Sequence, residues 1–108
     1  MTKIQYKTAS RREVKCSLFK GKEEIDNQVK CDLTFRIHII SNRTHVEGNI
    51  ETSKELSITY EDLRETQFKI ILDKPIGKIK EIPIVFNSVD WDGKKHANFK
   101  SMKRVDDQ

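Results

Sequence analysis

Glycine is scarce in this sequence, with four glycines among 108 residues. A loop that cradles phosphates needs several glycines in one short stretch, so P-loop chemistry is excluded. The G-x-S-x-G turn of hydrolases and the H-E-x-x-H helix of metalloproteases are also missing. Glu61 and Asp62 are adjacent carboxylates, but the dipole of a helix that starts there accounts for both. We therefore expect a protein that is not an enzyme.

Long hydrophobic runs are absent too. No stretch approaches the length of a membrane span, and the first residues lack the apolar segment of a secretory signal. We expect a soluble, cytoplasmic protein with no membrane partner.

Cysteine is limited to Cys16 and Cys31, and their spacing to His38, His45 and His96 is not that of metal ligands. We therefore expect neither a metal nor a cofactor. In a reducing cytosol the two cysteines should be free thiols that face the core.

The sequence does contain strong hydrophobic alternation between Val29 and Ile39, where every second residue is apolar. Side chains on a strand point to opposite faces in turn, so this pattern predicts one buried and one wet face. A parallel strand covered on both faces would instead be apolar throughout. The stretch is therefore predicted to be a long, central, antiparallel strand.

The neighbours of this strand follow from matching the apolar faces. The preceding strand, around Val14 to Leu18, is predicted to pair with Cys16 opposite Cys31. The following strand is predicted to pair with Ile39 opposite Val46, which places His38 opposite Glu47.

Weaker signals mark the rest of the chain. Residues 3–8 are expected to form a short edge strand, and residues 9–12 a turn or bulge. Residues 56–60 should form a strand that runs into a short helix, with Thr59 and Asp62 at its start. Residues 74–77 are expected to form a turn, and Pro83 to lie at an edge, a bulge or a strand start.

The Asp92-Gly93 pair is the strongest turn signal and predicts a hairpin. In this hairpin Phe86 lies opposite Phe99, and Val89 lies opposite His96.

These elements predict a mainly β protein, either an antiparallel sandwich or a small barrel, with seven to eight strands and one short helix near residues 60–66. The order of three strands, a helix and further strands resembles the OB barrel in order alone. One domain is expected over residues 1–104, with a disordered tail at 105–108. The predicted core comprises Val14, Leu18, Leu33, Phe35, Ile37, Val46, Ile50, Phe68, Ile70, Leu72, Ile84 and Phe86.

Charge is unevenly distributed along the chain. The net charge is +6 over residues 1–22, −5 over residues 23–62 and +3 over residues 63–108. Both ends are basic and the middle is acidic. Basic blocks attract phosphates, although most charge runs are solvated surface.

The candidate binding residues lie in the two basic ends. The predicted hairpin places Trp91, Lys94 and His96 on one face, where an exposed ring among cations is typical of single-stranded nucleic-acid binders. The alternative is that Trp91 packs under the N-terminal strand. The candidate nucleic-acid-binding residues are Arg11, Arg12, Lys15, Trp91, Lys94, Lys95, His96 and Lys100.

Two functions remain open. The first is a small binding module for single-stranded nucleic acid, which requires that the basic ends be neighbours in the sheet. The second is a protein-binding module, such as a small inhibitor or an immunity-type protein of a phage or mobile element. It would act through a strand edge or through the acidic middle segment. The expected partner is thus a nucleic acid or a protein.

Overall fold

The computed structural model describes residues 6–41, 43–56, 58–65, 67–90, 93 and 95–102. These residues form six antiparallel strands and one short helix, so the mainly β class is confirmed and the expected seven to eight strands are corrected to six. The elements are β1 (Tyr6–Lys20), β2 (Glu23–His38), β3 (Thr44–Glu51), α1 (Tyr60–Glu65), β4 (Phe68–Ile76), β5 (Ile79–Val89) and β6 (His96–Ser101).

Two of the expected strands are not separate elements. Of the strand expected at residues 3–8, the described residues 6–8 belong to β1, which continues from Tyr6 to Lys20. The strand expected over residues 56–60 is not found among the described residues of that range, where Leu56 and Ile58 are buried in coil and Tyr60 begins α1. Two apolar residues separated by one position show only that both side chains face the core. A coil can bury them in this way as well as a strand, so the pattern does not distinguish the two.

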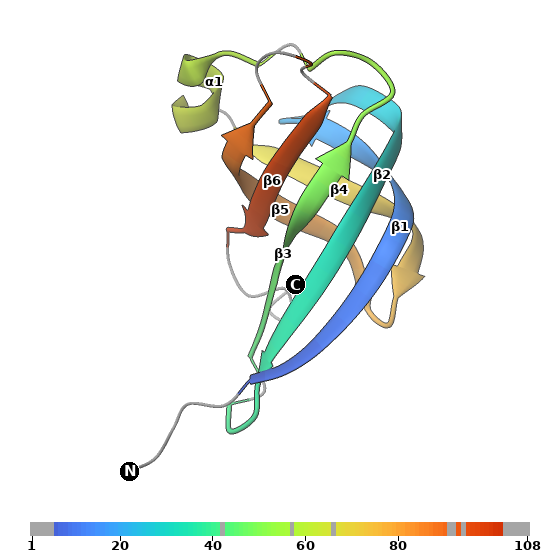
Figure 1. The fold of residues 1–108 in the computed structure, drawn as a ribbon, viewed down its shortest axis with the longest axis vertical. Coiled ribbons are helices and arrows are strands. Elements are labelled where there is room, and N and C mark those ends of the chain that lie inside the picture. The colour runs from blue at the N-terminus through green and yellow to red at the C-terminus, as the bar shows by residue number, and fades with distance from the viewer. Residues whose placement is uncertain are drawn as a thin grey trace.

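The strands close into a barrel in the order β1-β2-β3-β6-β5-β4, with β4 returning to β1 (Figure 1). Two three-stranded meanders, β1-β2-β3 and β4-β5-β6, are connected through α1 and joined by the β1–β4 and β3–β6 pairs. Of the two expected architectures, the structure has the barrel. Its ring has one strand more than the five-stranded OB barrel.

The barrel interior holds the hydrophobic core. Nine of the twelve predicted core residues are buried, while Val14, Ile37 and Phe86 are partly buried. Cys16, Cys31, Ile82 and other residues complete the core. Alternation predicted most of these positions because each strand has one face inside the ring.

The predicted pairing of β1 with β2 has the right direction and faces but the wrong register. Val14 lies opposite Cys31, and Cys16 lies opposite Val29. The error is two residues, which keeps each side chain on its predicted face. The cysteines are therefore diagonal neighbours and not opposite each other, but both are free, with 3.5 Å between their Sγ atoms. Their hydrogen bond and their burial raise the pKa of the Cys16 thiol, which stays protonated at neutral pH.

The predicted register of β2 with β3 is wrong by four residues. Val46 lies opposite Phe35, and Thr34 lies opposite Glu47. The strand ends at His38, so Ile39 is left in the turn and is 56% exposed. The expected pair of His38 with Glu47 is replaced by an ion pair between Arg36 and Glu47, at 2.6 Å.

The β4–β5–β6 meander agrees in part with the predicted pairs and turns. Phe86 lies opposite Phe99 as predicted, but a bulge after Phe86 places Val89 opposite Ala97 and not His96. The turn after β4 is at Gly77, with φ of 62°, which is later than expected. Trp91, Asp92 and Lys94 lie outside the described residues.

The expected place of Pro83 at an edge, a bulge or a strand start is wrong: it lies inside β5, opposite Lys69, in a ring where β5 has a neighbour on both sides. Its carbonyl accepts from the Met102 N–H, just beyond the end of β6. The nitrogen and carbonyl of a strand residue point to the same side, so the missing N–H faces the end of β6, where the ladder stops, and not β4.

The helix begins as predicted. Asp62 N donates to Thr59 Oγ1 at 3.1 Å, and Thr59 N donates to Asp62 Oδ2 at 3.0 Å, which is a reciprocal cap. Lys20 pairs with Asp62 at 3.1 Å and ties the helix to the end of β1. Leu63 packs on the core. The predicted helix end at residue 66 and the predicted tail at 105–108 lie outside the described residues.

Candidate functional site

A β-bulge in β1 sets the direction of its basic side chains. Arg11 lies opposite Leu33 and Val14 lies opposite Cys31, so two residues of β1 face one residue of β2. The extra residue inverts the alternation, which places Arg11 on the same side of the sheet as the buried Leu33. Glu13 takes a φ of 52°, and its N–H donates to Asp32 Oδ1 at 2.9 Å. The bulge expected over residues 9–12 is therefore present, slightly later in the chain.

The barrel is open on one side of this bulge. The β1–β4 ladder covers only Cys16–Lys20 with Phe68–Leu72, and the register of β4 with β5 shifts between Ile71 and Ile76. A hollow of about 600 Å³ lies where the two strands separate. Its lining residues are Arg11, Glu13, Val14, Lys15, Asp73, Lys74, Pro75 and Ile76.

Two of the predicted binding residues, Arg11 and Lys15, thus line one hollow. Lys74 adds a third cation from β4, and Glu13 and Asp73 supply two carboxylates. The apolar part of the lining consists of Val14, Pro75 and Ile76. Sequence reasoning missed Lys74 because nothing in the pattern shows that β1 and β4 are neighbours.

A second basic feature extends from the hollow toward one end of the long axis of the molecule (Figure 1). We call it the basic arm and define it as residues 6–12 of β1 together with residues 33–46 of β2, the following turn and the start of β3. These residues include five Lys or Arg and no Asp or Glu. The cations are Lys7, Arg11, Arg12, Arg36 and Arg43.

Exposed apolar side chains lie at the tip of the basic arm. Tyr6 is 51% exposed, Ile39 56% and Ile40 80%. The Tyr6 ring meets the His38 ring edge-on, with 5.5 Å between centroids. The alternation up to Ile39 suggested burial, so this exposed ring and the two isoleucines were not predicted.

The C-terminal candidate residues lie elsewhere. In the ring, β6 is separated from β1 by two strands in either direction, so β6 and the basic N-terminal strand are not neighbours in the sheet. The adjacency that a joint surface requires is absent. Trp91 and Lys94 lie outside the described residues.

Lys100 and His96 of β6 lie opposite acidic residues of β3. Lys100 lies opposite Glu47, and His96 lies opposite Glu51, with 4.0 Å between Nε2 and Oε1. Lys95 is exposed, and its carbonyl accepts from the N–H and hydroxyl of Thr52. The β6 strand thus runs beside acidic residues of β3, one of which, Glu47, also pairs with Arg36 of the basic arm.

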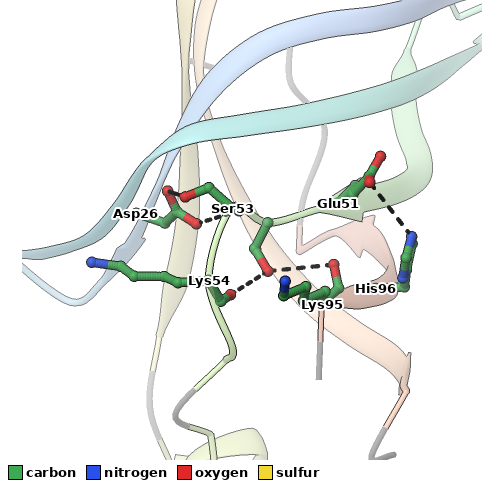
Figure 2. A network of polar contacts seen from close by, with 7 residues as sticks. Asp26, Glu51, Ser53, Lys54, Lys95 and His96 are labelled. Atoms are coloured by element: carbon green, nitrogen blue, oxygen red, sulfur yellow. Dashed lines mark hydrogen bonds and ion pairs between the residues drawn. The ribbon is translucent and has the colours of Figure 1, made fainter. Parts of the chain in front are cut away.

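Asp26 is the centre of a polar network at the other end of β2 (Figure 2). It is 4% exposed and accepts from Gln28 N, Ser53 N and Ser53 Oγ at 2.8–2.9 Å. Burial alone would raise the pKa of the carboxyl, but these hydrogen bonds and one from Lys54 N outweigh it, so the pKa lies below its usual value. Asp26 therefore joins the loop after β3 to β2, which is a structural role.

No group of three or more potential metal ligands occurs among the residues that the structure describes. Within the same residues, no helix has the length and apolarity of a membrane span. Comparison with protein-family models, curated proteins and solved structures found no match.

Proposed function

We propose that this protein is a non-enzymatic binding module for single-stranded nucleic acid and that the basic arm is its contact surface. The observation that carries the proposal is the segregation of charge: five cations and no acid lie within residues 6–12 and 33–46. Phosphate contacts supply most of the affinity of non-specific nucleic-acid binding. Glu47 at the border of the arm pairs with Arg36, which leaves Lys7, Arg11, Arg12 and Arg43 as an excess of cations on this part of the barrel.

The residues at the tip of the basic arm favour single-stranded nucleic acid over duplexes as the ligand. Tyr6 presents an exposed ring on the same face of the β1–β2 ladder as Arg36, while Lys7 points to the opposite face. Exposed rings among cations stack on unpaired bases. In a duplex the bases are already stacked and paired. Tyr6 therefore takes the part first assigned to Trp91.

Fluorescence anisotropy with a labelled single-stranded oligonucleotide at graded salt concentration tests the proposal. Affinity should fall steeply as salt rises, with a slope of roughly −0.7 per phosphate contact on a log–log plot. The absence of salt-dependent binding at protein concentrations up to roughly 100 μM, where non-specific binding is expected, would refute it.

The Tyr6→Ala variant tests the stacking role. It should weaken binding by about 1–3 kcal/mol, while Tyr6→Phe, which keeps the ring, should bind like the parent. Equal losses in both variants would assign the effect to the hydroxyl and contradict stacking.

A protein partner is the second candidate, and one observation favours it. Within the described part of the chain, residues 6–15 of β1 have ladder partners on β2 alone. The other edge of this stretch is therefore open to an added strand over residues 6–11, before the bulge interrupts it. A partner that binds there should protect the β1 amides from hydrogen exchange with little dependence on salt.

A further inference from the structure

We infer that the hollow between β1 and β4 is a separate site for one phosphorylated ligand of nucleotide size. It is lined by Arg11, Lys15 and Lys74 around an apolar floor. This site shares Arg11 with the basic arm, but its other lining residues lie outside the arm, and its occupation does not depend on binding of a nucleic-acid chain.

The dimensions suit such a ligand. The volume of about 600 Å³ lies within the range of roughly 300–1,000 Å³ that is usual for small-molecule sites. The hollow is open to solvent on one side, so a ligand can enter without movement of a strand.

The hollow results from two irregularities in facing strands. In β1 the bulge forces Glu13 into a φ of 52°, a region that side chains other than glycine rarely adopt. In β4 the ladder to β1 stops at Leu72, and the strand then turns away. Bulges and strained backbone positions are frequent at binding sites, where they direct side chains toward a ligand.

The lining matches the parts of a nucleotide. Arg11, Lys15 and Lys74 offer donors and positive charge to a phosphate group. Val14 and Ile76 offer an apolar surface to a base. Three cations against two carboxylates leave the lining net positive, which suits a dianionic monoester.

An extended peptide fits this place less well. A peptide that adds to a sheet edge needs a regular row of backbone donors and acceptors. The β1 edge is interrupted by the bulge between Arg11 and Val14 and carries the charges of Arg12 and Glu13, and both features protect strand edges from pairing.

The test is a titration of isotopically labelled protein with adenosine 5′-monophosphate, followed by the methyl signals of Val14 and Ile76. Adenosine and inorganic phosphate are titrated in parallel. The nucleotide should shift both methyl signals and bind more tightly than either fragment. Failure to shift them, or equal affinity for phosphate alone, would overturn the inference.

Lys74→Ala and Lys78→Ala form a matched pair of variants. Lys74 lines the hollow, whereas Lys78 is an exposed lysine in the nearby β4–β5 turn and does not line it. Loss of the Lys74 ammonium should weaken nucleotide binding by roughly tenfold to hundredfold, as for one hydrogen bond to a charged group. Loss of Lys78 should change it by less than about twofold. Similar losses in both variants would contradict a site in the hollow.

Separate titrations distinguish this inference from the proposed function. Lack of oligonucleotide binding with intact nucleotide binding would refute the basic arm alone. Oligonucleotide binding without methyl shifts on adding the nucleotide would refute the hollow alone. If an acidic extended peptide shifts the two methyl signals and the nucleotide does not, the hollow is a protein-binding site and the inference is wrong.

Discussion

Asp26 is a residue whose role comes from hydrogen bonds made to a distant part of the chain. Gln28 donates to it locally, as in an Asx turn, but Ser53 lies far away in the sequence. The hydrogen bond from Gln28 could be predicted from the sequence, because an Asp often accepts from the backbone N–H two residues later. The hydrogen bonds from Ser53 could not be predicted, because they depend on the β2–β3 register, and the register predicted from alternation was wrong.

We predict that Asp26→Asn destabilises the protein at neutral pH by about 1–3 kcal/mol, because charged hydrogen bonds to Ser53 and Gln28 are weakened. The folded pKa of Asp26 lies below the unfolded value of about 3.9. The contribution is therefore present above about pH 4 and is lost as the pH falls through the folded pKa.

Urea unfolding of the parent and of Asp26→Asn at graded pH measures this effect. The difference in unfolding free energy should shrink in acid, where Asp26 is protonated. A difference that stays constant from neutral to acidic pH would show that the charge of Asp26 contributes nothing.

Gly48 is required by a close approach between β2 and β3. A Cβ atom at this position would lie 1.9 Å from the Asp32 carbonyl oxygen, and backbone would have to move. We predict that Gly48→Ala destabilises the protein by about 1–3 kcal/mol or more. The exposed neighbour Asn49, replaced by Ala, should change stability by less than about 0.5 kcal/mol. Thermal or urea unfolding checks both, and a neutral Gly48→Ala would contradict the β2–β3 register.

At the scale of elements, periodicity predicted the properties of single strands, such as their position in the chain and their buried face. The alternation over residues 29–39 identified β2 and its buried face, and the reciprocal cap at Thr59 and Asp62 located α1. The predicted registers were wrong because a shift of two residues keeps every apolar side chain on the same face, so matching the apolar faces does not exclude it. A bulge in β1 and a turn that begins at Ile39 then decided the pairing.

The β1 bulge yields its own prediction. Glu13→Gly should change the free energy of unfolding by less than about 1 kcal/mol, because relief of the positive φ offsets the greater freedom of the unfolded chain. Glu13→Val should destabilise by about 1–2 kcal/mol, since a β-branched side chain resists this conformation.

Lys15→Val is the control for Glu13→Val, because Lys15 lies in regular strand geometry two residues along β1. Valine suits an extended strand, so this variant should be close to neutral. Urea unfolding of the three variants compares them. Equal destabilisation at positions 13 and 15 would rule out strain at the bulge.

At the scale of the whole molecule, charge is separated along the long axis, which measures 45 Å. The basic arm occupies one end, while Glu23, Glu24 and Glu55 lie around Asp26 toward the other. The charge blocks in the sequence did not predict this separation, because the arm joins residues 6–12 of the basic N-terminal block to residues 33–46 of the block that is acidic as a whole. Nor could they predict that β6 lies across the barrel from β1, because ring closure is a long-range property.

Two charge-matched double variants test the central claim, that the basic arm and not the overall charge binds single-stranded nucleic acid. Lys7→Ala with Arg12→Ala removes two arm cations, and Lys95→Ala with Lys100→Ala removes two cations from the β6 side. Each lowers the net charge from +4 to +2.

The measurement is the affinity of both double variants for one single-stranded oligonucleotide as a function of salt. The arm variant should lose affinity, and its log–log salt slope should fall by roughly 1.4, as for two lost phosphate contacts. The β6 variant should keep the parental slope. Equal losses in the two, or a larger loss on the β6 side, would contradict the basic arm as the binding surface.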